Sequence, residues 1–336
     1  MSSATVQEYN QAAASVPEDA LLGSLVWYTL SEVDIPYERA RKELEDRGLD
    51  TALLKPIRPI DAYRLATQEL KHSFPAVDGV KLNIMVRNVG HDSETAYRQI
   101  VCERVSTKKG QRRKLIYDPS AELIYHRGTR DKDGNISGDR VEVIKRTPPG
   151  LEREMTTEQR AWLDERLDAL PGRFQHLRTH LGNHKVRNFV REYLYSLGAV
   201  AVRESGGVYF VRQSRNDELE KLGGWIHSIG SAFHSTPLLD LVNQREMLAR
   251  AFEEEAIKEV ERLSGEIDKI LSDSGRKVRE KTFDDYALRA AELTSKAKEY
   301  ADMLDIRSEI AHKRIEQFKQ KTMNLVDRID YNDSKG

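Results

Sequence analysis

The stretch that decides the fold prediction is 184–212, HKVRNFVREYLYSLGAVAVRESGGVYFVR. Its first part carries apolar residues at spacings of three and four, which is typical of an amphipathic helix. This stripe consists of Val186, Phe189, Val190, Tyr193, Leu194 and Leu197. Asn183 is placed to cap the helix at its N-terminus, and Gly198 supplies a left-handed residue at its C-terminus. The stretch therefore begins with a short helix.

Two strand-like runs follow this helix. AVAVRE and VYFVR are rich in β-branched and aromatic residues. The turn between them contains Gly206 and Gly207, which tolerate the positive φ of a tight hairpin turn. A basic helix followed by a two-stranded hairpin is the order of a winged helix. We therefore predict a winged-helix-like module over 151–236, with these two glycines at the hairpin turn.

The module concentrates positive charge that the rest of the chain balances. The whole sequence has a formal net charge of −1, yet residues 171–215 hold eight lysines and arginines against Glu192 and Glu204. Phosphate is the natural partner of such a concentration, so we expect DNA or RNA to bind here. The expected contact residues are Arg178, Lys185, Arg187, Arg191, Arg203 and Arg212. The alternative is a small packing module with a solvated basic face.

The hairpin and the helical tail behind it resemble an uncharacterised family of bacterial and bacteriophage proteins. The shared pattern is Arg-x-x-Gly-Gly-Val-Tyr-Phe-Val before a coiled coil, formed here by Arg203 and residues 206–211. The resemblance covers about 155–305. It implies a mobile-element or phage setting, and it implies no activity, catalytic residue or cofactor.

Two further modules are expected before this one. Residues 1–17 are small and polar and suggest a flexible N-terminus, and residues 18–72 predict a bundle of three short helices. The helices are expected at 21–33, 35–49 and 60–70. Charges of both signs alternate in the second helix, so we favour packing or partner binding over a recognition helix.

Residues 80–147 predict an antiparallel β module. Five strand-like runs are separated by turn-forming residues, which favours a meander or a small barrel. One hairpin tip in this module is strongly basic. Its residues Lys108, Lys109, Arg112 and Arg113 are a second candidate contact with a nucleic-acid backbone. The alternative is that these side chains only keep a sheet edge soluble.

The C-terminal part, 237–330, predicts a coiled-coil helical hairpin. Apolar residues recur at threes and fours in 238–271 and again in 283–329, and Ser272 to Gly275 interrupt the pattern. Two long antiparallel helices with a bend at this break are expected. A narrow apolar seam buries little surface for its length, so association through 238–329 with a second copy or a protein partner is expected.

Composition and motifs exclude several functional classes. With Cys102 as its one cysteine, the chain has no internal disulfide and no cysteine-built zinc site. No apolar run reaches the roughly 20 residues of a membrane span, and the N-terminus has no signal-peptide pattern, so we expect a cytoplasmic protein. No phosphate-binding glycine loop, dinucleotide motif or GxSxG is present, so no catalytic residue and no cofactor are predicted.

Three histidines four residues apart, His176, His180 and His184, have the spacing of metal ligands on a helix. We do not predict a metal site, because Pro171-Gly172 and Gly182-Asn183 bracket and interrupt the segment and no carboxylate is placed to complete it.

Together these features predict an α+β protein with several modules that binds nucleic acid without catalysis. A structural or adaptor protein that acts through its coiled coil is the alternative. A hydrolase with an unrecognised site is a third hypothesis.

Overall fold

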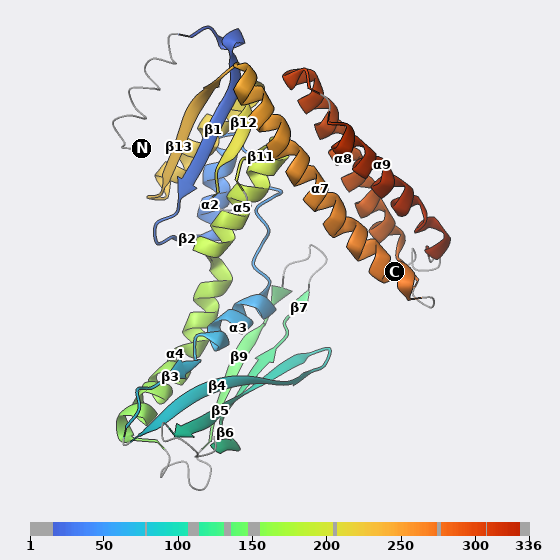
Figure 1. Ribbon diagram of the computed structural model, residues 1–336. Helices are drawn as coiled ribbons and strands as arrows, with labels where there is room; N and C mark the ends of the chain where they lie inside the picture. Colours follow the sequence, from blue (N-terminus) through green and yellow to red (C-terminus); the bar gives the residue numbers. More distant parts are fainter. Residues whose placement is uncertain are drawn as a thin grey trace. The chain divides into compact units, whose positions relative to one another are not determined.

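The computed structural model describes residues 16–77, 79–106, 114–130, 136–146, 155–203, 207–273, 277–306 and 308–329. Contacts divide the chain into two compact units (Figure 1). Unit 1 comprises residues 1–33, 43–53 and 183–336, and unit 2 comprises 34–42 and 54–182. Each unit combines segments that are distant in the sequence. Among the described helices, none has the length and apolar character needed to cross a membrane.

Unit 2 contains a five-stranded antiparallel sheet, which confirms the predicted antiparallel character of this region. Its order is β3 (His72–Ser73), β4 (Val80–His91), β5 (Thr95–Ser106), β6 (Lys114–His126) and β9 (Arg140–Lys145). Two of the five strand-like runs, RRKLIYD at 112–118 and AELIYHRG at 121–128, contribute to one strand, β6, from Lys114 onward. The register of the pair β5–β6 shifts between Ile100 and Cys102, so the long strand β6 pairs with β5 through a bulge or similar irregularity. The sheet is open, because its order runs from β3 to β9 without closure.

Two short strand pairs complete unit 2. β7 (Thr129–Arg130) pairs with β8 (Ile136–Ser137), and β2 (Asp34–Pro36) pairs with β10 (His180–Gly182). The second pair joins residues from the start and the end of the unit.

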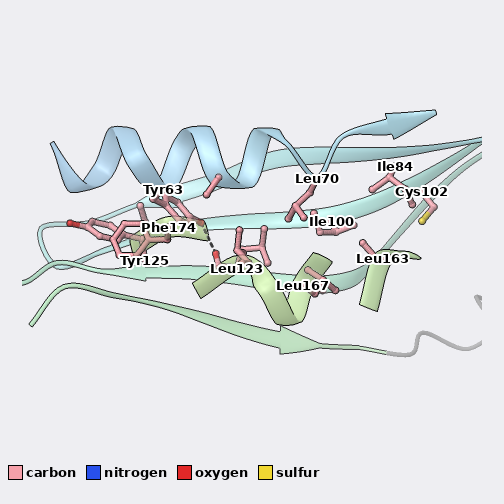
Figure 2. Packing of buried hydrophobic residues seen from close by; sticks show 14 of the residues in the cluster. Tyr63, Leu70, Ile84, Ile100, Cys102, Leu123, Tyr125, Leu163, Leu167 and Phe174 are labelled. Carbon is pink, nitrogen blue, oxygen red and sulfur yellow. Dashed lines mark hydrogen bonds between the residues drawn. The ribbon is translucent and has the colours of Figure 1, made fainter. Parts of the chain in front are cut away.

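Helices α3 (Pro59–Gln68) and α4 (Thr157–Thr179) supply the helical part of the unit 2 core, which Figure 2 shows. The buried residues from both helices, from the turn after α3 and from the sheet form one cluster that includes Tyr63, Leu70, Ile84, Ile100, Leu123, Tyr125, Leu163, Leu167 and Phe174. The Tyr63 hydroxyl donates a 2.8 Å hydrogen bond to the Leu123 carbonyl, so the one polar atom of this side chain is satisfied inside the core. The predicted helix at 60–70 is confirmed.

Helix α4 continues through Pro171-Gly172 to Thr179, although the sequence predicted an interruption at this dipeptide. Thr156 caps its start in a reciprocal arrangement with Gln159. Proline removes one helical hydrogen bond, but apolar side chains on both sides of it, Leu167 and Phe174 among them, are buried in the same core. Tertiary packing therefore maintains the helix through the proline.

Unit 1 is built on a four-stranded sheet of order β11 (Val200–Ala201), β12 (Tyr209–Arg212), β1 (Leu21–Thr29) and β13 (Ala232–Leu239). All its neighbouring strands are antiparallel. The prediction of a helix at 21–33 is wrong, because residues 21–29 form the inner strand β1. The sequence did not predict strand β13, which pairs with β1 along most of its length.

The helix expected at the start of the quoted stretch is α5 (Asn183–Ser196), and its apolar stripe is buried. Asn183 is the first residue of α5, and its side-chain oxygen accepts a 2.6 Å hydrogen bond from the Val33 amide. Gly198 and Gly207 both have positive φ, at 78° and 62°. The strands β11 and β12 pair antiparallel, as the predicted hairpin requires, and they form one edge of the four-stranded sheet.

Helix α6 (Asn216–Ser228) follows the hairpin and buries Trp225 and Ile226. The rings of Phe189 on α5 and Trp225 meet edge to face, with centroids 5.3 Å apart. Short 3-10 helices lie at Glu18–Ala20, Gln213–Arg215 and Val326–Arg328, and α2 (Tyr37–Glu45) is divided between the two units.

Three helices form the C-terminal part of unit 1: α7 (Val242–Ser272), α8 (Glu280–Leu304) and α9 (Glu309–Met323). The apolar stripe predicted between Leu248 and Ile270 is buried. The prediction of one helix over 283–329 is wrong, because Asp305 adopts a left-handed conformation and the Ser308 hydroxyl caps a new helix. The predicted break after Ser272 is confirmed as the end of α7.

Candidate nucleic-acid interface

Helix α5 separates a buried apolar face from a polar ridge that is exposed except at the half-buried Asn188, because its apolar residues recur at helical spacing. The ridge consists of His184, Arg187, Asn188, Arg191 and Tyr195, and we call these five residues the α5 stripe. Arg187 and Arg191 are exposed and lie one helical turn apart. Neither forms an ion pair with a carboxylate of the described residues, and the same is true of the half-buried Lys185 beside the stripe.

The phenols next to this stripe carry no charge at neutral pH. Burial raises the pKa of Tyr28 and that of Tyr195 to about 12. The Tyr28 hydroxyl donates to the backbone carbonyl of Arg187, at 3.4 Å. Tyr195, at the far end of the stripe, is 41% exposed. The surface therefore combines two uncompensated guanidinium groups with an accessible aromatic ring.

Other arginines of the predicted interface are already occupied by carboxylates. Arg178 lies 3.0 Å from the buried carboxylate of Asp139, and Arg212 lies 2.6 Å from Glu299. Two further members of the basic segment are also paired, Arg173 with Glu69 and Arg215 with Glu218. A paired arginine adds little net charge to a surface, so the structure concentrates the unpaired charge of this segment on α5.

The hairpin contributes one further exposed cation, Arg203. It comes just before residues 204–206, and the Val202 amide closes the hairpin by donating to the Val208 carbonyl at 3.0 Å. Arg203 forms no ion pair with another described residue. Gly206 and the basic loop residues Lys108, Lys109, Arg112 and Arg113 lie outside the described residues.

The base of the hairpin is held by polar side chains that the sequence analysis did not single out. Glu255 on α7 accepts a 2.7 Å hydrogen bond from the Ala201 amide, and Lys296 on α8 donates to both Glu255 and the Ala199 carbonyl at 2.7 Å. The Tyr300 hydroxyl donates to the Gly198 carbonyl at 3.0 Å. The unpaired edge of β11 is thereby covered from the C-terminal helices.

The structure brings together two of the three histidines that the sequence analysis set aside. Because α4 continues past Pro171, His176 lies in its last turn and His180 at its C-terminal end. Asp34 on β2 lies beside them, so a carboxylate is present where none was expected. No local pattern could have identified it, because Asp34 and His176 are 142 residues apart. His184 is the first exposed member of the α5 stripe.

The chain belongs to a family of unknown function, DUF6744, whose profile matches residues 21–331. The match extends over the sheet, the hairpin and the C-terminal helices, in agreement with the resemblance to an uncharacterised family. Comparison with curated proteins and with solved structures finds no match.

Proposed function

We propose that this member of the DUF6744 family binds the sugar–phosphate backbone of a nucleic acid through the α5 stripe and Lys185. One observation carries the proposal: Arg187 and Arg191 are exposed, adjacent and without a carboxylate partner among the described residues. Uncompensated arginines gain most from phosphate, because each contact releases a counterion that the nucleic acid had condensed. The function is binding, and no catalytic group is assigned.

The dimensions of the stripe suit a short backbone contact. From His184 to Tyr195 a helix rises about 16 Å, at 1.5 Å per residue. Phosphates on one DNA strand are about 3.4 Å apart along the axis, so the stripe spans several of them. Contacts of this kind fix position but carry no sequence information, so we expect weak discrimination between sequences.

The exposed ring of Tyr195 adds a second kind of contact. Aromatic rings stack on the bases of single strands with little regard to sequence. Arg203 extends the basic surface toward the hairpin tip, and the loop at Lys108–Arg113 is the second proposed contact. A winged-helix-like use of α5 and the hairpin, a cytoplasmic location and a phage setting belong to the same proposal.

A second candidate function is association through the C-terminal helices. Leu288 on α8 and Ile310 and Met323 on α9 are large apolar residues that are each more than half exposed. The inner seams are occupied within the chain, where Leu263 and Phe318 are buried. A partner or a second copy would therefore use outer faces of α8 and α9. A coiled-coil arm with an open seam is disfavoured.

Fluorescence anisotropy with labelled oligonucleotides tests the proposed binding. The full chain is titrated into a duplex, a single strand of the same length and a single strand with an uncharged methylphosphonate backbone, each at several salt concentrations. We expect binding to both charged probes that weakens steeply with salt, and much weaker binding to the uncharged probe. Equal affinity for charged and uncharged backbones would contradict phosphate recognition. Failure to bind at low salt would leave association through α8 and α9 as the better account.

A further inference from the structure

Three potential metal ligands converge in unit 2, at the joint between α4 and the β2–β10 pair. One nitrogen from each of His176 and His180 and one oxygen of Asp34 lie within 4.8 Å of one another. The pairing of β2 with β10 places Asp34 opposite Gly182, and the neighbouring pair Leu181–Ile35 is buried. The backbone positions of the three ligands are therefore fixed by strand pairing and by the last turn of α4.

We propose that Asp34, His176 and His180 bind a divalent transition-metal ion of the zinc type. Two imidazole nitrogens and one carboxylate oxygen are a common ligand set for Zn²⁺, with water in the remaining position. Mg²⁺ and Ca²⁺ prefer oxygen ligands throughout, so this set does not suit them. The three ligands belong to unit 2 and the α5 stripe belongs to unit 1, and the proposal does not rest on phosphate binding at α5.

Thr179 orients one of the two histidines. Its hydroxyl has a single hydrogen, and the Gln175 carbonyl, 3.0 Å away, accepts it. The hydroxyl oxygen of Thr179 also lies 2.9 Å from Nδ1 of His180. Because its own hydrogen is directed at the Gln175 carbonyl, we assign a proton to Nδ1, which donates to Thr179. This tautomer leaves the lone pair on Nε2 of His180 free for a metal. Such outer hydrogen bonds are typical of metal-binding histidines.

Binding requires a rotation of at least one imidazole. The rings of His176 and His180 are stacked, with centroids 4.1 Å apart and planes 16° from parallel. An ion lies near the plane of each ring that binds it, at about 2.0–2.1 Å from the nitrogen. Two nearly parallel planes cannot both contain the ion, so the stack must open. His176 Nε2 is now 2.9 Å from Asp34, and the ion would replace this hydrogen bond.

All three side chains can make this change, because none is in the core: Asp34 is exposed and both histidines are half-buried. The ion would connect the end of α4 to β2 in addition to the strand pairing. Since it binds the folded chain, it should raise the melting temperature, by an amount that grows with the logarithm of the ion concentration divided by its Kd.

Isothermal titration of the chelator-treated full chain with ZnCl₂ tests the site. We expect one equivalent to bind, with affinity at least tenfold lower in Asp34→Asn and in His180→Ala. Thr179→Val keeps every ligand but removes the orienting hydroxyl, so we expect a loss of about 10–100-fold. His91→Ala is the matched control, since His91 is an exposed histidine of the same unit. It should bind like the wild type.

Circular dichroism in the presence of chelator shows whether each variant is folded. Asp34→Asn is nearly isosteric at an exposed position, so it separates loss of a ligand from loss of fold. Cobalt absorption in the visible range provides a second readout, because bands of a low-symmetry site should appear in the wild type and be lost in Asp34→Asn. Absence of zinc binding in the wild type would overturn the proposal. Unchanged zinc affinity in both Asp34→Asn and His180→Ala would also overturn it.

Discussion

The two sheets of this protein are connected in opposite ways. In unit 2, β4, β5 and β6 follow one another in the sequence and pair in that order. In unit 1, the inner strand β1 comes first in the chain and pairs with β12 and β13, so that Leu25 lies opposite both Phe210 and Thr236. One sheet depends on local turns, and the other depends on strands that meet only after most of the chain is made. Contacts between distant segments cost more chain entropy to form.

Removal of residues 1–33 should reduce the stability of unit 1 more than any of the substitutions below. The deletion takes away β1, so β12 and β13 lose the strand that separates them and their backbone hydrogen bonds to it. We expect hydrogen exchange in β12, α6 and β13 to become fast, while β4, β5 and β6 keep their protection.

A deletion of residues 1–15 is the control, because it leaves β1 intact. Protection of β12 and β13 that survives the longer deletion would show that unit 1 does not depend on its inner strand.

Alanine substitutions at Gly23 and Gly207 should distinguish two costs. One is the steric cost of the close approach between β1 and β12, and the other is the backbone strain of a left-handed turn residue. Gly23 has a φ of 153°, and a Cβ there would overlap the Val211 carbonyl and lie 2.8 Å from the Cα of Arg212. Gly207 in the hairpin also has positive φ, but a Cβ there would meet nothing within 4 Å. We expect Gly23→Ala to cost about 1–3 kcal/mol of overpacking beyond its backbone strain. Gly207→Ala should cost only the left-handed strain, about 1 kcal/mol.

Urea unfolding measures both changes, because each midpoint shift at constant slope reports a change in stability. Equal losses in the two variants would mean that β1 can move away from β12 at no cost.

The hydrogen bonds of Glu255 and Lys296 at the base of the hairpin should contribute less to the stability of unit 1 than strand β1 does. Glu255→Ala leaves the Ala201 amide and the Lys296 ammonium without their shared partner. The side chains of Glu255 and Lys296 are each less than a quarter exposed. We expect a loss of about 1.5–3 kcal/mol, the range for hydrogen bonds to charged groups.

Glu255→Gln keeps an acceptor for the amide but removes the charge, so its loss should be smaller. Thermal melting of the two variants beside the wild type checks the order, and a Gln variant as unstable as the Ala variant would assign the effect to the ion pair alone.

Sequence patterns predicted the parts of the fold that are encoded by neighbouring residues. The apolar stripe of α5, the stripe of α7 and the strands of unit 2 all have periodicities that a single element satisfies. The run at 21–29 is mostly apolar and has no such periodicity of its own. Its strand conformation is fixed by β12 and β13, which lie far along the chain. The proline at 171 was a misleading local signal, because burial on both sides outweighs one lost hydrogen bond.

The candidate sites divide in the same way. Arg187 and Arg191 could be predicted, since helical spacing alone places them opposite the apolar stripe of α5. The pairing of Arg178 with Asp139 and of Arg212 with Glu299 could not, because each carboxylate is supplied by a distant segment. Asp34 was missed for the same physical reason.

The salt dependence of nucleic-acid binding by the double variant Arg187→Ala/Arg191→Ala is the decisive test of phosphate binding by α5. The slope of log affinity against log salt on a labelled duplex is measured for this variant, for the wild type and for Arg173→Ala, whose arginine is paired with Glu69. We predict that the double variant loses about 1.8 from the slope, at about 0.9 for each phosphate contact removed. Arg173→Ala should leave the slope unchanged. A double variant with the wild-type slope would contradict the assignment of phosphate binding to α5.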